Sequence, residues 1–304
     1  MKLASYVNNI CNRHNWPVLF ALVLLVLAVI VKPVQLNQSI YRYQIAFDIS
    51  QSMQVKDVSR QGQSYDRLRL AKQAARDLLR NLPCGSYLGW SVFTGRRTLT
   101  LLTPLEVCAH YDGLLSSLDE IDGSMRWSNG SIIGKGIYQL IRAVHENEEN
   151  TNIIFFSDGH EAPPLEQGQR GIQKTDKFKV SGLLIGVGGD TPVPIPKMAA
   201  DGSIARNWNA DEVVQKAGST SGEELSRRHD DHLLTLSRLS GLVYHPYQSE
   251  QAFTRAAMDK RFSQKQQSAY DIRWIPALLT LMLLMWRFSP VAADFRTIMP
   301  RFSK

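Results

Sequence analysis

Residues 41–52 have the sequence YRYQIAFDISQS, an apolar run that ends in a short polar loop. The aromatic and β-branched side chains of residues 41–47 predict a β-strand. Directly after it, Asp48, Ser50 and Ser52 place one carboxylate and two hydroxyls at alternating positions. Such oxygen ligands suit a hard divalent cation such as Mg²⁺, Mn²⁺ or Ca²⁺. A loop of this kind is more often a simple turn, so the metal interpretation depends on the rest of the chain.

Two downstream segments supply further oxygen ligands. Residues 152–156 form a second apolar run that leads into Asp158, and open α/β sheets bind ligands at the carboxyl ends of their strands. Ser131 lies in a glycine-rich turn that opens a helix predicted to reach about residue 145. Taken alone, Ser131 is a helix N-cap and Asp158 part of an Asp-Gly turn. Together with the Asp48 loop, and in this order, they favour one shared metal site.

These three loops resemble the metal-ion-dependent adhesion site of von Willebrand factor A (VWA) domains. Asp48, Ser50 and Ser52 match the Asp-x-Ser-x-Ser signature, Ser131 stands where the family usually has threonine, and Asp158 matches the third-loop aspartate. The resemblance covers roughly residues 40–245. It implies that the hydroxyls contact the metal directly and the carboxylates mostly through water. It also implies that the sixth metal position is left for an Asp or Glu of a partner protein.

The order of strand and helix patterns predicts an α/β fold with a doubly wound, mostly parallel sheet. A hairpin over residues 87–93 and 98–102 supplies one antiparallel edge strand. The other predicted elements are helices at 66–82, 111–121 and 233–239 and strands at 180–187 and 243–244. The VWA domain is thereby placed at residues 40–248, followed by a connecting helix within 249–273.

Two proline-containing segments, residues 159–179 and 190–232, exceed what a minimal domain of this kind needs. Proline favours extended surface backbone, and long loops are usually functional or disordered. Two interpretations stay open at this point: a partner-docking surface beside the metal, or a decorated edge of the domain.

Two apolar segments flank the domain. Residues 16–31 contain no charge, and Trp16 and Lys32 are suitable interface anchors, which predicts an uncleaved transmembrane anchor over 16–34. The alternative is a cleaved signal peptide, but no small-residue cleavage site follows. Residues 274–293 predict a second membrane helix, because the flanking arginines can extend to the interface.

The net charge of +7 resides almost entirely in the tails. Residues 1–34 and 274–304 each carry three net positive charges, which leaves one for the middle of the chain. No basic stripe is left there for nucleic acid. Positive tails on both sides predict cytoplasmic tails at 1–15 and 294–304, with the domain across the membrane. In a Gram-negative cell the domain would be periplasmic at the inner membrane.

Cys84 and Cys108 flank the predicted hairpin symmetrically about residue 96, inside its turn. Antiparallel pairing would bring both sulfurs to one end of the hairpin, within disulfide reach. A disulfide fits an oxidising compartment. The alternative is a pair of buried free thiols.

Other sites are weaker. The segment from His229 to His232 offers zinc ligands but more simply forms a solvated helix face. His160 and Glu161 could act as an acid–base pair, yet no nucleophile elbow accompanies them, and the chain is not expected to be an enzyme. Asp57 is expected to cap a turn or to hold a water near the metal.

Several further motifs are similar to those of one branch of the family, the membrane-anchored VWA proteins of methanol dehydrogenase maturation (MxaL type), which accompany MoxR-type AAA+ ATPases. The motifs are QSM at 51–53, PCGS at 83–86, EVC at 106–108, APP at 162–164 and PVPIP at 192–196. This resemblance implies a scaffold that helps insert Ca²⁺ into a periplasmic quinoprotein dehydrogenase. The alternatives are an envelope-assembly or stress protein of the Bat type and, from another class, a hydrolase using Asp48 and Asp158 around Mg²⁺.

Overall fold

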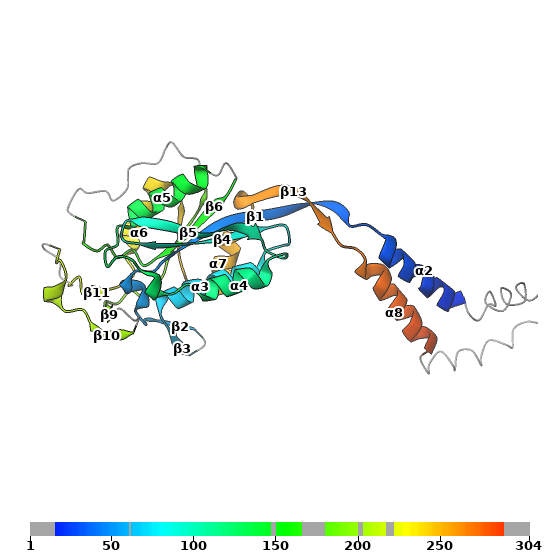
Figure 1. Cartoon of the computed structure of the whole chain (residues 1–304), viewed down its shortest axis with the longest axis horizontal. Helices are drawn as coiled ribbons and strands as arrows, with labels where there is room; N and C mark the ends of the chain where they lie inside the picture. The colour runs from blue at the N-terminus through cyan, green and yellow to red at the C-terminus, as the bar shows by residue number, and fades with distance from the viewer. Residues whose placement is uncertain are drawn as a thin grey trace, which may run out of the picture. The chain divides into compact units, whose positions relative to one another are not determined.

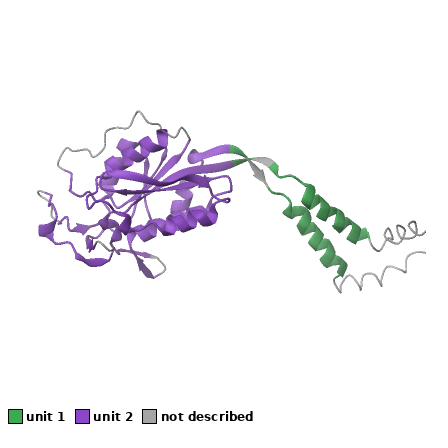
Figure 2. Ribbon diagram, viewed as in Figure 1, with its two compact units in different colours: residues 1–38, 266–304 green, residues 39–265 purple. Residues whose placement is uncertain are grey.

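The computed structural model describes residues 16–60, 62–146, 150–165, 180–199, 203–216 and 222–288. The chain divides into two compact units, one of residues 39–265 and one of residues 1–38 with 266–304 (Figure 2). The tails predicted at 1–15 and 294–304 lie outside the described residues.

The larger unit is built on a sheet with strand order β12-β7-β6-β1-β4-β5, and β13 also pairs with β1 (Figure 1). Neighbours along this order are parallel except β4 and β5, which form an antiparallel edge. The predicted mostly parallel sheet with one antiparallel edge strand is therefore confirmed. The strands are β1 (Val34–Asp48), β4 (Tyr87–Thr94), β5 (Arg97–Glu106), β6 (Asn152–Ser157), β7 (Gly182–Gly186), β12 (Val243–Pro246) and β13 (Ser263–Tyr270).

Helices cover both faces of this sheet, because successive side chains of its central strands point to opposite faces. Ile154 and Phe156 of β6 join a core cluster with α3, α4 and α7, whereas Ile153 and Phe155 join a second cluster with α5 and α6. Figure 1 shows α5 and α6 on one side of the sheet and α3 and α4 on the other. The helices are α3 (Arg67–Asn81), α4 (Tyr111–Asp119), α5 (Ile133–Glu146), α6 (Asp230–Ser240) and α7 (Glu250–Ala257).

Short elements decorate the end of the sheet where β1 and β6 finish. A 3-10 helix, η1 (Gln51–Gln54), follows β1, and β2 (Val58–Arg60) pairs with β3 (Gln63–Tyr65). The segment 190–232 contains two further small sheets, in which β8 pairs with β11 and β9 with β10. The remaining short elements are β8 (Val193–Pro194), β9 (Pro196–Met198), β10 (Ile204–Asn207), β11 (Leu225–Ser226), η2 (Gly123–Met125), η3 (Ala210–Glu212) and η4 (Lys260–Phe262).

The predicted end of the domain is wrong. The connecting helix predicted within 249–273 is α7, which ends at Ala257, and its Phe253 is fully buried in the core of the domain. A strand, β13, follows over Ser263–Tyr270. Its sequence, SQKQQSAY, has little of the β-branched or aromatic character that marks a strand, so its pairing with β1 rests on backbone hydrogen bonds that a residue pattern does not reveal.

The two flanking apolar segments form helices, α2 (Trp16–Ile30) and α8 (Trp274–Phe288). They pack together, and the Thr280 hydroxyl lies 3.4 Å from the carbonyl oxygen of Ala21. Each helix has 15 residues and spans roughly 22 Å, against about 30 Å of hydrocarbon. Within the described ranges no helix is both long and apolar enough to cross a membrane, so the predicted spanning of 16–34 and 274–293 is not confirmed.

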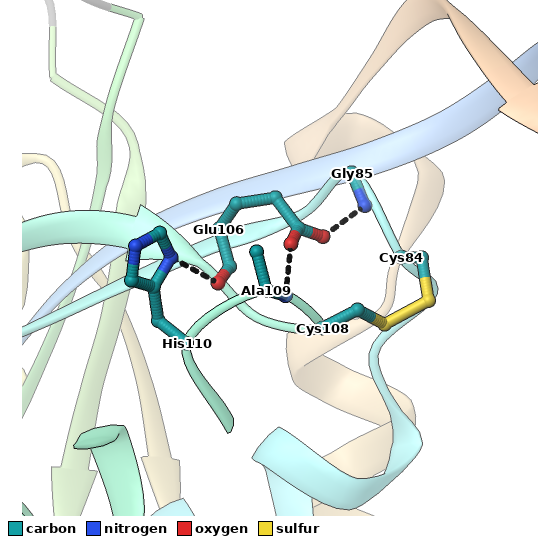
Figure 3. The surroundings of a disulfide bond; sticks show 6 residues. All are labelled: Cys84, Gly85, Glu106, Cys108, Ala109 and His110. Carbon is teal, nitrogen blue, oxygen red and sulfur yellow. Dashed lines mark hydrogen bonds between the residues drawn. A yellow bond between two sulfur atoms is a disulfide. The ribbon is translucent and has the colours of Figure 1, made fainter. Parts of the chain in front are cut away.

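A disulfide joins Cys84 and Cys108, whose Cα atoms are 5.3 Å apart, as the hairpin symmetry predicts (Figure 3). Glu106 lies beside it, and its carboxylate accepts hydrogen bonds from the backbone N–H groups of Gly85 (2.6 Å) and Ala109 (2.5 Å). These bonds tie the two ends of the hairpin together next to the sulfur bridge. Although two cysteines and a carboxylate meet here, the sulfurs are bonded to each other and offer no thiolate to a metal.

Replacing both Cys84 and Cys108 by serine is expected to lower the free energy of unfolding by about 3 kcal/mol, because the bridge closes a loop with a sequence separation of 24 residues. Urea denaturation of the full chain in detergent measures the change. A reductant should destabilise the wild type by a similar amount and leave the double variant unaffected. Equal sensitivity of both proteins to the reductant would contradict a stabilising bridge.

Candidate metal centre

The first loop of the predicted site begins where β1 ends between β4 and β6. Asp48 is fully buried, and its carboxylate accepts hydrogen bonds from the backbone N–H of Ser50 (2.9 Å) and from the hydroxyl of Ser157 (2.8 Å). The buried hydroxyls of Ser50 and Ser52 lie 3.1 Å from each other at the start of η1. In this loop the two hydroxyls therefore lie together, and the Asp48 carboxylate is held by the hydrogen bonds from Ser50 and Ser157.

Ser131 is held in place by backbone bonds on both sides. Its N–H donates to the carbonyl of Ala162 (2.6 Å), and the N–H of Ala162 donates back (2.9 Å). On the other side, the N–H of Ile132 donates to the carbonyl of Gly95 (2.6 Å) in the β4–β5 turn. These bridges connect the second loop to the hairpin and to the loop that follows β6.

The Ser131 hydroxyl is buried and has no hydrogen-bond partner among the described residues. The N-cap interpretation is therefore wrong: the carboxylate of Glu161, rather than Ser131, accepts the N–H of Ile133 (3.2 Å) at the start of α5. Buried hydroxyls without a partner are rare in proteins. A buried hydroxyl without a partner among the described residues therefore fits a metal ligand at this position.

Asp158 follows the last residue of β6 and is also fully buried. One carboxylate oxygen accepts the backbone N–H of His160 (3.0 Å). The other accepts from the Arg67 guanidinium (2.5 Å) and from the Ser226 hydroxyl (3.0 Å). Asp158 is therefore held by long-range partners, beyond the local Asp-Gly turn that Gly159 forms with φ of +81°.

The two buried carboxylates influence each other. Burial and then the neighbouring Asp158 charge raise the pKa of Asp48. Burial also acts to raise the pKa of Asp158, but the Arg67 guanidinium, followed by His160, outweighs burial and lowers it. A divalent cation beside Asp48 would favour its ionised form. The donor set of two carboxylates and three hydroxyls therefore fits a hard divalent cation.

Arg67 is the functional residue that the sequence analysis missed. Its side chain is completely buried, forms a two-point ion pair with Asp57 (3.0 and 2.6 Å) and also reaches Asp158. A signal was present, since Arg67 opens α3 on the same face as Ala71, Ala74 and Leu78, where a lone arginine among apolar residues demands a buried partner. Asp57 is thus shown in an ion pair that the sequence did not predict, and it also accepts the backbone N–H of Gly189 (2.9 Å).

The segment 190–232 closes over the first loop. The side-chain oxygen of Gln51 accepts hydrogen bonds from the backbone N–H of Met198 (3.2 Å) and from the indole N–H of Trp208 (2.8 Å). Its amide donates to Asn129 (2.8 Å) beside the second loop. Ser226 reaches Asp158 from the far end of the same segment. This placement puts the segment beside the candidate site, as the interpretation as a partner-docking surface requires, and partner docking itself stays a prediction. Most of the other long segment, residues 166–179, lies outside the described residues.

Replacing Gln51 by alanine is expected to accelerate hydrogen exchange at the Met198 amide about thirtyfold, because two bonds that hold the segment are lost at about 1 kcal/mol each. Exchange mass spectrometry of the full chain measures this. Gln251→Ala, an exposed change on α7, is the control. Unchanged exchange in residues 193–199 of the Gln51 variant would show that other contacts hold the segment.

The histidines next to the site are more enclosed than predicted. The His229 ring lies 5.6 Å from the ring of His160, and His232 Nε2 is 2.9 Å from a carboxylate oxygen of Glu161. Only Asp231 of the 229–232 segment is exposed, so the prediction of a solvated helix face is wrong for the histidines. Burial lowers the pKa of His160 and that of His229, which favours the neutral rings.

The three hydroxyls meet at one cavity of about 280 Å³. Ser50, Ser52 and Ser131 line it on one side, and the 190–232 segment lines the other with Ile195, Trp208, Val213 and Val214. Of the five sequence-predicted residues, the three serines line this cavity. Asp48 and Asp158 are fully buried and do not line it, but Asp48 accepts the Ser50 N–H and interacts with the Asp158 charge.

Comparison with known proteins agrees with this arrangement. Residues 44–160 match the family model described as von Willebrand factor type A domain. Within these residues the chain matches a VWA domain. The match includes all three loops of the candidate site. No curated protein matches the chain.

Two solved structures illustrate the likeness. An aerotolerance-related membrane protein from Bacteroides fragilis is 21% identical, covering 71% of this chain and 96% of that one, with a TM-score of 0.51. BatB from Bacteroides thetaiotaomicron is 22% identical, covering 71% and 95%, with a TM-score of 0.48. At these identities the likeness of the first supports the VWA fold and nothing finer.

Proposed function

We propose that this VWA domain binds a partner protein through a divalent metal, Mg²⁺ or in its place Mn²⁺ or Ca²⁺, and performs no catalysis. The observation that carries the proposal is the buried Ser131 hydroxyl, which has no partner among the described residues and opens on the same cavity as Ser50 and Ser52. When bound, the metal supplies an open coordination position for a carboxylate of the partner. The chain's own hydrogen bonds hold the Asp48 and Asp158 carboxylates in place.

The arrangement of Asp158 supports binding rather than hydrolysis. A metal-dependent hydrolase needs a general base beside its metal-bound water. One oxygen of Asp158 accepts from Arg67 and Ser226, and one oxygen of Glu161 is engaged by Ile133 and His232. Together with the His160 N–H, these contacts occupy both oxygens of Asp158, which supports a binding role for this carboxylate, whereas the second oxygen of Glu161 is buried without a partner among the described residues. Robust phosphoester turnover by the purified wild type, lost in Asp48→Ala, would favour the hydrolase instead.

Asp48→Ala is expected to abolish metal-dependent capture of a partner. A photo-reactive amino acid at position 129, beside the second loop, would be cross-linked in native membranes with Mg²⁺ and with EDTA. Wild type should give Mg²⁺-dependent products that the variant lacks, because Asp48 is the carboxylate of the first loop. Asp112→Ala, an exposed acidic change on α4, is the matched control. Products that persist in Asp48→Ala would contradict a metal-mediated contact.

Two cellular roles are compatible with such a module. The likeness to a protein described as aerotolerance-related supports an envelope-assembly or stress role of the Bat type. The motifs at 83–86, 106–108 and 192–196 support the second candidate, an MxaL-type role in the maturation of a quinoprotein dehydrogenase with a MoxR-type ATPase. The identity of the cross-linked protein decides between them: a dehydrogenase subunit favours the second candidate, and its absence favours the first.

We also propose that the chain is attached to the inner membrane, with the domain on the periplasmic side. The exposed apolar side chains of α2 and α8, such as Val29, Leu281 and Trp286, suit contact with lipid. The Cys84–Cys108 disulfide suits an oxidising compartment. Non-reducing mass spectrometry of the membrane-extracted protein tests this placement, and two free thiols there would contradict it.

A further inference from the structure

A second cavity adjoins the candidate metal centre on the side of the β4–β5 hairpin. It measures about 610 Å³ and is lined by Arg96, Arg97, Leu99 and Trp127. Gly130, Ser131, Ala162 and Pro163 line both this cavity and the 280 Å³ cavity described above. We call the two together the docking groove. Ser131 therefore lies where its two halves meet.

The two halves of the groove differ in chemistry. On the hairpin side, Arg96 and Arg97 are exposed, and neither forms an ion pair with a described residue. Trp127 beside them is 43% exposed. Two unpaired guanidinium groups with an aromatic ring suit a carboxylate-bearing segment.

On the other side, the 190–232 segment contributes an apolar wall of Ile195, Trp208, Val213 and Val214. Val214 is 65% exposed although it faces the cavity. Acidic groups are present here too: Glu212 is paired with Lys197 (2.6 Å) and Arg206 (2.5 Å), while Glu223 also lines the wall. This half therefore favours an apolar side chain and disfavours a second carboxylate.

We propose that the docking groove binds an extended segment of the partner with an ordered pattern: an acidic side chain toward Arg96 and Arg97, a central acidic residue at Ser131, and an apolar side chain toward Trp208 and Val214. This inference rests on the proposed function, because the central carboxylate is the one offered to the metal. The flanking preferences come from the two walls and do not depend on the metal. They define a partner motif in which acidic and apolar residues lie on opposite sides of a central Asp.

Synthetic peptides test this pattern by fluorescence anisotropy with the full chain in detergent and Mg²⁺. The reference peptide has two Glu on one side of a central Asp and two Leu on the other. One comparison peptide replaces both Glu by Lys, and another replaces both Leu by Ser. We expect the wild type to bind the reference peptide about tenfold more tightly than the Lys peptide, because two exposed ion pairs are lost.

Variants of the groove assign each preference to its wall. The double change Arg96→Glu with Arg97→Glu should make the protein bind the peptide with two Lys more tightly than the reference peptide. Arg255→Glu, an exposed change on α7, should leave the original preference unchanged. Val214→Asp should weaken binding of the reference peptide several-fold. Binding of the peptide in which Ser replaces both Leu should stay unchanged. Because these positions are exposed, the substitutions are compatible with folding, and urea denaturation verifies this.

The outcomes separate the inference from the proposed function. Mg²⁺-dependent binding with equal affinity for the Glu and Lys peptides would overturn the ordered pattern and leave the metal contact standing. An affinity for the reference peptide that is the same in EDTA as in Mg²⁺, with the flank preferences intact, would support the groove and overturn the metal contact. Failure of every peptide to bind, with or without Mg²⁺, would overturn the docking groove.

Discussion

Replacing Arg67 by alanine is expected to lower the free energy of unfolding by about 3–5 kcal/mol, the typical effect of removing one partner from a buried ion pair. The guanidinium contacts Asp57 and Asp158 from a fully buried position. Without it, Asp158 becomes an uncompensated charge in the interior, close to a second buried carboxylate at Asp48. Urea denaturation of the full chain in detergent measures the loss.

Arg76→Ala is the matched control, because Arg76 lies on the same helix and pairs with Asp119 at the surface, where the two side chains are 24% and 56% exposed. Surface pairs contribute about 0–1 kcal/mol. If the two variants were equally destabilised, the burial of Arg67 would have no energetic consequence. A further expectation follows from the bond to the Ser52 carbonyl (3.3 Å): the Arg67 variant should also bind metal more weakly, because the first loop loses a support.

The fold was predictable because its determinants are local. Buried strands such as β6 consist of consecutive apolar residues, and α3 begins after Asp66, whose carboxylate accepts the N–H of Arg69 (2.7 Å) as an N-cap should. By contrast, β13 is specified by its partner β1 rather than by its own residues. The existence of the flanking helices could be predicted from their apolar composition, but their length could not. Helix α2 ends at Ile30, shortly before Pro33, because proline disfavours a helical conformation in the residue before it.

The residues of the candidate site could be predicted for a related reason. Asp48 ends β1 and Asp158 directly follows β6, and these strands prove to be neighbours, so their meeting at one sheet edge needed only the strand order. The supports of the site could not be predicted in this way. Arg67 and Ser226 are 159 residues apart in the chain, and Gln51 and Trp208 are 157 apart. Contacts at such separations depend on how the 190–232 segment folds back, which no local pattern encodes.

Mg²⁺ is expected to stabilise the wild-type chain and to leave Ser131→Ala nearly unaffected. At a metal concentration 100 times its Kd, a ligand that binds only the folded state adds about 2.7 kcal/mol. Loss of one of three hydroxyls removes a direct ligand and with it most of this increment. In EDTA the Ser131→Ala variant should be more stable than the wild type. The Ser131 hydroxyl is buried without a described partner, so its removal relieves a desolvation cost of about 1–3 kcal/mol. Unfolding in urea with EDTA or with Mg²⁺, Mn²⁺ or Ca²⁺ measures both effects.

Ser117→Ala provides the opposite pattern as a control. The Ser117 hydroxyl lies on α4, outside the three loops; it accepts the indole N–H of Trp90 (3.1 Å) and donates to the carbonyl of Leu114 (3.1 Å). Its loss should cost about 1 kcal/mol in EDTA and leave the metal increment intact. A Ser131 variant that behaved like Ser117→Ala would show that the hydroxyl serves the fold. If Ser131→Ala is at least as stable as the wild type in EDTA and is not stabilised by Mg²⁺, the Ser131 hydroxyl serves to bind the metal and not to stabilise the fold.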